Sequence, residues 1–181
     1  MATPPDFTAG QVLTAAQMNA VGLWLVKSQT IGSAVSSISV TDAFSADYDN
    51  YRIIVSGGVA STSTHISLRM GTTNAGYYWG TITTRYDTGA TVNNNGNNVA
   101  QWDLPFYGTT DSLGGVADVL CPFLSKNTRL VQAVPENTTT SAGTRVGGGY
   151  LNNTTSYTSF TLTVGSGTVT GGIVAVYGYR K

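Results

Sequence analysis

Charge is the first property that this sequence lacks. Only 10% of its 181 residues are charged, compared with roughly 25% in an ordinary soluble domain. Nine basic side chains balance nine acidic ones, so the formal net charge at pH 7 is zero. Such a chain has no field that would attract nucleic acid or an anionic membrane surface. We therefore expect neither as a partner, and the neutral surface suits a protein that works inside an assembly.

Cysteine, histidine and glutamate each occur once, which removes several kinds of active site. Cys121 cannot form a disulfide within the chain, and its apolar neighbours predict a buried thiol that behaves as a small hydrophobe. His65 has no partners in the pattern of a zinc site or a serine triad, so we expect it on a strand with one ordinary hydrogen bond. With Glu136 as the only glutamate, the carboxylate pair of a glycosidase would have to come from aspartates, most of which are scattered. We predict a protein that is not an enzyme and needs no cofactor.

Three aspartates do crowd one segment. Asp42, Asp47 and Asp49 could offer oxygen ligands to calcium, but their spacing does not match an EF-hand loop. Aspartate also favours turns, because its side chain bonds the local backbone. Turn formation is the preferred interpretation, and calcium binding by this loop stays open.

Long apolar runs are also missing. No stretch approaches the length of a membrane-spanning helix, so we expect no membrane insertion. The first residues lack the charged and apolar regions of a signal peptide, and we expect no export signal.

The chain consists instead of short apolar runs that alternate with stretches of Gly, Ser, Thr and Asn. In residues 51–56 the β-branched Ile53, Ile54 and Val55 favour a strand over a helix. Short, regularly spaced strands are typical of an all-β antiparallel sandwich of jelly-roll type, which we predict for residues 30–181. The Asn-Gly pair within residues 93–98 predicts a tight hairpin turn. The predicted strands are 35–40, 51–56, 65–70, 78–85, 99–107, 115–121, 128–134, 144–151, 159–164 and 172–179.

The N-terminal segment, residues 1–29, has a different pattern. Two consecutive prolines make residues 1–11 an extended arm. Thr14 and Gln17 then form a capping box, which predicts a short α-helix that runs to about residue 27. Such a helix is marginal alone, so its apolar face must dock on the β-domain, on another copy or on another protein. The residues predicted for that face and its staple are Leu13, Met18, Val21, Trp24 and Leu25.

One group of aromatic residues suggests ligand binding. Aromatic rings combine flat apolar faces with polar tips, which suit both sugars and protein partners. Packing in the core or between subunits is the alternative for the same side chains. The candidates for receptor contact are Tyr77, Tyr78, Trp79, Trp102 and Tyr107.

Two stretches of the sequence resemble a known class of proteins. Residues 7–19, FTAGQVLTAAQMN, resemble the opening of many tailed-bacteriophage tail and fibre proteins. Residues 44–56, FSADYDNYRIIVS, with ISLRM at 66–70 and VYGYRK at 176–181, are similar to a β-domain that recurs in phage structural proteins. The resemblance implies a virion structural protein of tail-fibre, baseplate or appendage type, assembled in the host cytoplasm. It also implies a homotrimer, other virion proteins as partners, and contact with a host-surface glycan or protein.

Two alternatives remain. Within the same class, the chain could be a capsid decoration protein or a head fibre. From another class, it could be a carbohydrate-binding or polysaccharide-depolymerising module. Glycan binding that depends on Trp79 or Trp102 would favour a lectin, and reducing-end release that depends on one aspartate would favour an enzyme.

Overall fold

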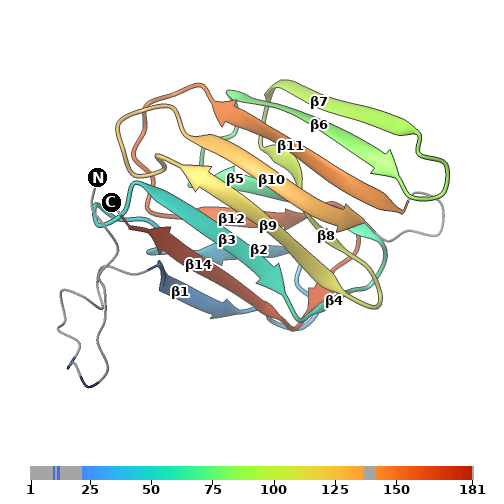
Figure 1. Cartoon of the computed structure of the whole chain (residues 1–181), viewed down its shortest axis with the longest axis horizontal. Helices are drawn as coiled ribbons and strands as arrows, with labels where there is room; N and C mark the ends of the chain where they lie inside the picture. The colour runs from blue at the N-terminus through green and yellow to red at the C-terminus, as the bar shows by residue number, and fades with distance from the viewer. Residues whose placement is uncertain (1–9, 11, 13–21, 137–141, 181) are drawn as a thin grey trace.

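The computed structural model describes residues 10, 12, 22–136 and 142–180. Throughout these residues the regular secondary structure is β-strand, and the architecture is the antiparallel β-sandwich that the alternating pattern predicts (Figure 1). None of the described segments forms a helix that is long and apolar enough to span a membrane.

Four nested strand pairs give the chain a jelly-roll topology. The first strand pairs with the last, and each inner pair repeats this relationship, as in a long hairpin that has been rolled up. All four pairings are antiparallel. The pairs are β1 (Leu23–Thr30) with β14 (Ile173–Tyr179), β2 (Ser37–Val40) with β12 (Phe160–Val164), β3 (Asn50–Ser56) with β9 (Leu113–Leu120), and β5 (Thr64–Met70) with β8 (Trp102–Gly108).

Four further strands widen one of the two sheets. They continue beyond β9, so the large sheet has the order β1-β14-β3-β9-β10-β11-β6-β7. The small sheet has the order β2-β12-β5-β8 and joins the large one where β8 meets β9. A separate two-stranded ribbon pairs β4 (Val59–Ala60) with β13 (Val169–Thr170). The added strands are β6 (Tyr77–Arg85), β7 (Thr91–Val99), β10 (Arg129–Glu136) and β11 (Gly143–Leu151).

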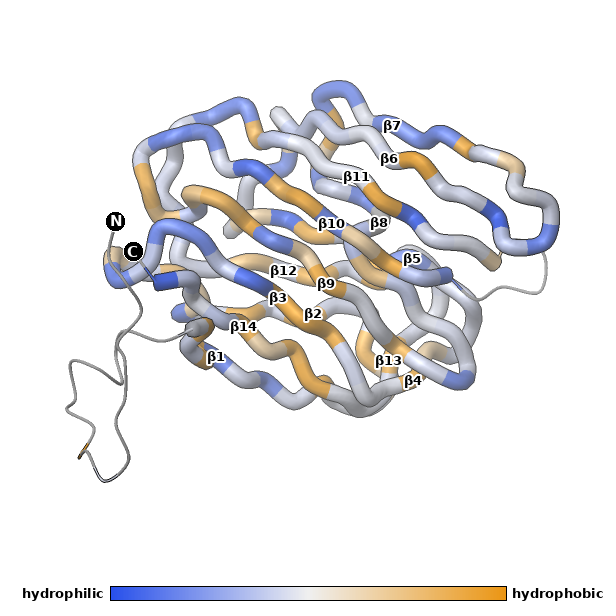
Figure 2. Tube along the Cα trace, viewed as in Figure 1, coloured by the Kyte–Doolittle hydropathy of each residue, from blue (hydrophilic) through white to orange (hydrophobic). Residues whose placement is uncertain are grey.

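The core lies between the two sheets, and alternation along each strand fills it. In β3, Tyr51, Ile53 and Val55 are buried, while the residues between them point to the other face. The small sheet contributes the buried side chains of Leu68 and Leu162 in the same way. Figure 2 shows the apolar positions concentrated along β3, β9, β10 and β14, in the middle of the large sheet. The period-2 pattern therefore sets which face of each strand enters the core.

The prediction that the N-terminal helix runs to about residue 27 is wrong. Residues 23–27 belong to β1, where Trp24 pairs with Gly178 and Leu25 with Tyr177. Pairing with β14 supplies a ladder of hydrogen bonds, interrupted by one bulge between Leu25 and Lys27, whereas a short helix would be marginal by itself. Residues 23–29 are thus part of the large sheet. The other residues of the predicted face, Leu13, Met18 and Val21, lie outside the described residues.

The predicted turn at residues 93–98 is also wrong. This asparagine-rich run lies in β7, and the chain reverses earlier, where Arg85 N–H donates to the Ala90 carbonyl over 2.9 Å. Gly96 faces inward beneath the indole of Trp79, where a Cβ atom would overlap the ring. The glycine is therefore required for close packing within a strand, not for a hairpin turn.

Candidate interaction surface

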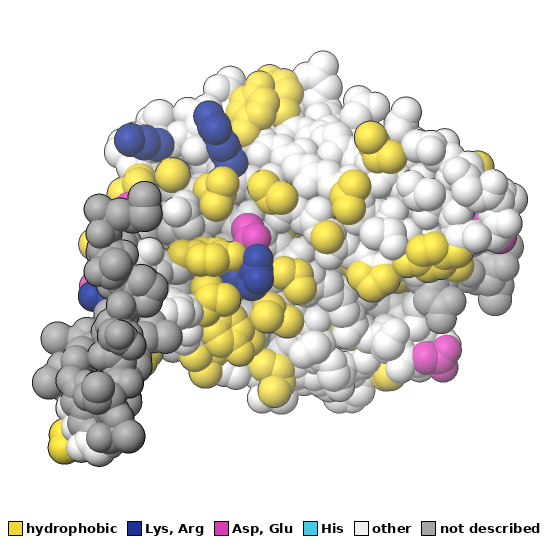
Figure 3. Space-filling view, in the orientation of Figure 1, with side chains coloured by type: hydrophobic (Ala, Val, Ile, Leu, Met, Phe, Trp, Pro, Cys, Tyr) yellow, Lys and Arg dark blue, Asp and Glu magenta, His cyan; other side chains and the backbone are white. Residues whose placement is uncertain are grey.

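The outer face of the large sheet points away from the core. In Figure 3, which looks onto this face, apolar side chains are spread over it around a central basic and acidic pair. An exposed sheet face normally alternates polar side chains with the buried apolar ones, so apolar residues on the outer side require an explanation.

Strand register aligns six of these outward residues in one line, which we call the apolar row. Each member is the Cα partner of the next across neighbouring strands. Val146 and Ile82 are 48% and 51% exposed, so they are far from buried within a single chain. The apolar row consists, strand by strand, of Ala175, Ile54, Val116, Ala133, Val146 and Ile82.

A bidentate ion pair occupies the adjacent row. Arg52 Nε and Nη2 each donate to a carboxylate oxygen of Asp118 over 2.9 Å, and Tyr179 Oη donates to the same carboxylate over 2.6 Å. The Arg52 guanidinium also lies 5.6 Å from the centre of the Tyr179 ring. The hydrogen bonds hold the two charged groups in one geometry. Because the charges are of opposite sign, this polar group has no net charge.

The pKa values of these groups follow from their contacts. The hydrogen bonds from Arg52 hold the pKa of Asp118 below its ordinary value, because they favour the ionised carboxylate. Burial, together with the bond to that carboxylate, raises the pKa of Tyr179 to about 12. At neutral pH the three side chains are therefore a carboxylate, a guanidinium and a neutral phenol.

The outer face is also hollowed in places. A depression of about 290 Å³ lies beside the ion pair, and its lining includes Asp118, Tyr179 and Val131, of which Val131 is 53% exposed. Another, of about 510 Å³, lies at the end of the apolar row and is lined by Ile82, Val146 and neighbouring residues. Hollows among exposed apolar side chains can receive the projecting side chains of a protein partner.

The five aromatic candidates for receptor contact do not form a common surface. Tyr77 and Trp102 are fully buried and meet edge to face at 5.0 Å, and Tyr107 is buried against His65. Trp79 is half-buried and packs against the core. These four residues contribute to packing, the alternative recognised for them above.

Tyr78 is the only one of the five on the outer face. Its ring stacks on that of Tyr150, with centroids 4.9 Å apart and planes 7° apart. Tyr150 was missed by the sequence reasoning, although it occupies an outward position in the predicted strand 144–151. Its alternation with the buried Leu151 could have identified it.

The three aspartates considered as calcium ligands, Asp42, Asp47 and Asp49, do not form a common metal-binding group. Asp47 accepts a hydrogen bond from Ser45 Oγ over 2.9 Å, and Asp42 has a left-handed backbone with φ of 54°. Across the described ranges, no three His, Cys, Asp or Glu side chains lie close enough together to hold a metal ion. These contacts fit the turn interpretation.

His65 has a more unusual setting than predicted. Its Nε2 lies 3.4 Å from Glu136 Oε1, and Glu136 also forms an ion pair with Arg145. Arg145 Nε donates to Thr83 Oγ1 over 3.2 Å. Glu136 is only 4% exposed, and burial lowers the pKa of Arg145 from its ordinary value. The cluster connects side chains of β5, β6, β10 and β11. Because Glu136 and Arg145 are buried, these contacts indicate a role in stability.

Comparison with models of known protein families finds no match for the sequence. Comparison with curated proteins finds no significant match either.

Proposed function

We propose that the protein is a structural protein of a tailed-phage virion, of tail-fibre or appendage type. It acts by binding without catalysis, and it associates with copies of itself through the outer face of the large sheet. The single observation that carries this proposal is the apolar row, which continues across six neighbouring strands. The virion class rests on the resemblance of residues 7–19 and 44–56 to phage proteins.

The area of the face supports a stable contact. Eight strands spaced about 4.8 Å apart and about 25 Å long present on the order of 900 Å². A standard specific interface buries about 800 Å² on each partner. The outer face is therefore about as large as one standard subunit contact, and in a trimer two neighbouring copies would share it.

The ion pair supports a second copy as the occupant. The face carries both signs of charge in Arg52 and Asp118, so a rotated copy can place opposite charges near each other. A partner of one dominant charge would gain nothing from this neutral group. Burial of the pair would also fix the register of the two copies, since misplaced charges are costly in an interface. The phage resemblance implies a homotrimer, in which this face would lie towards the three-fold axis and contact both neighbouring copies.

Two measurements test the proposal. Light scattering on the purified full chain should give three times the 18.9 kDa chain mass, and a monomer at all concentrations would contradict self-association. Gold-labelled antibodies against the chain should bind the tail of intact phage particles. Labelling of the capsid shell would instead indicate a decoration protein or head fibre.

A further inference from the structure

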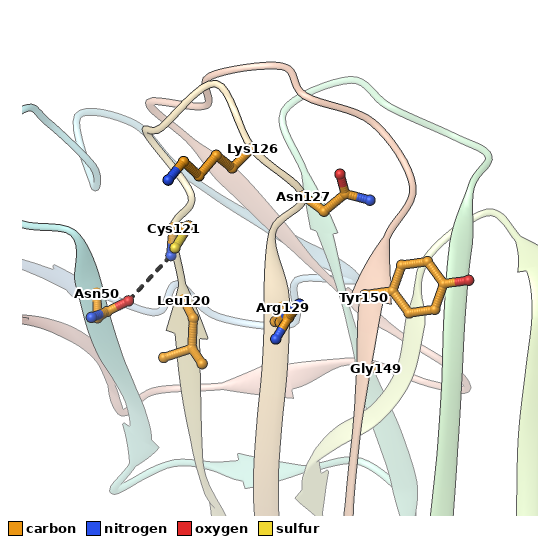
Figure 4. Close-up of a pocket in the computed structure, with 8 residues that line it drawn as sticks. All are labelled: Asn50, Leu120, Cys121, Lys126, Asn127, Arg129, Gly149 and Tyr150. Carbon is orange, nitrogen blue, oxygen red and sulfur yellow. Dashed lines mark hydrogen bonds between the residues drawn. The ribbon is translucent and has the colours of Figure 1, made fainter.

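A third depression lies at one end of the large sheet, away from the apolar row, and shares Asn50 and Leu120 with the hollow beside the ion pair. It has a volume of about 700 Å³ and lies where the segment after β9 rises beyond the ends of β3, β10 and β11 (Figure 4). Arg129 in its lining is four residues along β10 from Ala133 of the apolar row, or about 13 Å. A subunit contact centred on the apolar row therefore leaves this depression at the rim. Its lining is Asn50, Leu120, Cys121, Lys126, Asn127, Arg129, Gly149 and Tyr150.

The lining contains two cations and no acid. Neither Lys126 nor Arg129 lies within ion-pair distance of a carboxylate in the part of the chain that the structure describes. Arg52 and Arg145, by contrast, are each paired with a carboxylate. In a chain with so few charges, two uncompensated cations on one depression make a local field that attracts an anion.

The remaining groups suit a sugar. The Tyr150 side chain is 42% exposed and places an aromatic ring at the border of the depression, where one face of the ring stacks on Tyr78. The apolar side chain of Leu120 lies two strands away, with Arg129 between them. The amides of Asn50 and Asn127 border the same space. Asn50 Oδ1 accepts the Cys121 N–H over 3.3 Å, which leaves the amide N–H donors of Asn50 outside this bond. Amide donors of this kind can bind hydroxyl groups.

The local backbone holds the depression in shape. Cys121 adopts a left-handed conformation with φ of 59°, and its N–H donates to the Asp49 carbonyl over 2.9 Å. The bond to Asn50 Oδ1 adds a second restraint at the same residue. The segment that carries Lys126 is thus anchored to β3, and a prearranged site loses less entropy when a ligand binds.

We propose that this depression binds an anionic saccharide of the host surface, a sugar unit that carries a carboxylate or a phosphate. Arg129 and Lys126 bind the anionic group, with the guanidinium suited to two parallel hydrogen bonds. Tyr150 contacts the sugar ring, and the asparagine amides bind its hydroxyls. The inference rests on the proposed role of the chain as a host-contacting virion protein. In a trimer, three such sites would multiply a weak single contact.

Calorimetry on the full chain tests the proposal with three probes. These are a hyaluronan hexasaccharide for carboxylate, a glycerol-phosphate oligomer for phosphate, and maltohexaose as the neutral sugar. At least one anionic probe should bind, and maltohexaose should bind at least about tenfold more weakly. The variant with both Lys126→Gln and Arg129→Gln should lose about tenfold or more in affinity for the anionic probe. Lys27→Gln, which removes a cation from β1 instead, should retain it.

The lone cysteine provides a local readout. Cys121 is only partly buried, so the prediction of a buried thiol is wrong, and the residue lines the depression. Because it is the only cysteine in the sequence, the neutral reagent iodoacetamide reports occupancy directly. The bound anionic probe should slow alkylation of the wild-type chain and leave the double variant unaffected. Equal binding of all three probes, no binding of either anionic probe, or unchanged binding by the double variant would overturn the proposal. If the chain is a trimer but binds neither anionic probe, only the proposed saccharide site is rejected. If the chain is a monomer and a bound anionic probe slows alkylation of Cys121, only the proposed self-association is rejected.

Discussion

Arg52 and Asp118 are direct Cα partners across β3 and β9, and they form a bidentate ion pair on a sheet face that carries many exposed apolar side chains. Sixty-six residues separate them in the chain, yet Tyr179 from a third strand also donates to the same carboxylate. This relationship matters because the pair carries no net charge and marks a fixed polar position on the face. It is the feature that would set the orientation of a second copy.

The Asp118→Asn variant should lose about 1 kcal/mol of folding stability at pH 7, because both charges are partly exposed and the exchange keeps the shape. The pKa of Asp118 is lowered in the folded state, so its contribution is present above the ordinary pKa of 3.8. That contribution is lost as the pH falls through the lower folded value. Urea unfolding at several pH values should therefore show the two proteins converging at acid pH. A difference that stays constant or grows as the pH falls would contradict the ionised pair.

The Glu136→Gln variant should be far more damaging, with a loss of about 3 kcal/mol or more. The change leaves the buried guanidinium of Arg145 without its carboxylate, whereas Asp118→Asn leaves a cation that water can reach. Chemical denaturation measures the loss.

A second variant separates the charge effect from packing at this site. Combining Glu136→Gln with Arg145→Met removes the stranded cation, so it should recover part of the lost stability. If the double variant is less stable than Glu136→Gln alone, the cluster does not act through its buried charges.

Two glycines on neighbouring strands give a matched test of the β7 assignment. Gly96→Ala should destabilise the fold by roughly 1–3 kcal/mol, because the new methyl group overlaps the Trp79 indole. Gly80→Ala on β6 should be neutral or stabilising by about 0.5 kcal/mol, since a Cβ there meets nothing within 4 Å. Thermal melts of both variants measure the difference. Equal melting temperatures would mean that Gly96 does not pack against Trp79. That result would be expected if Gly96 lay in an exposed hairpin turn.

Much of the fold could be predicted because strand periodicity is a local property. Phe160, Leu162 and Val164 alternate with threonines, and the predicted strand over 159–164 is confirmed as β12. Each of the ten predicted strands overlaps an observed one. By contrast, β7 carries mostly asparagine on an edge of the sheet, so it has no clear apolar period. The strand β1 depends on pairing with β14, at the other end of the chain.

The candidate interaction surface could not be predicted because it depends on strand register. Ile54 and Ile82 both alternate with buried neighbours, but nothing local places them in the same row. The contact between His65 and Glu136 could not be predicted for the same reason, because the two residues are 71 positions apart in the sequence. Aromatic residues such as Trp102 were predicted as surface candidates from composition, whereas burial depends on how the two sheets pack.

The most direct test of the account is the solution mass of variants in the apolar row. Val146→Asp combined with Ile82→Asp places two charges on the proposed contact, and both positions are exposed in a single chain, so folding should be retained. Val59→Asp is the matched control, because this exposed valine lies in the small ribbon and not on the large sheet. We predict a trimer for the wild type and for Val59→Asp, and a folded monomer for the double variant. A double variant with the mass of the wild type would contradict the claim that copies associate through this face.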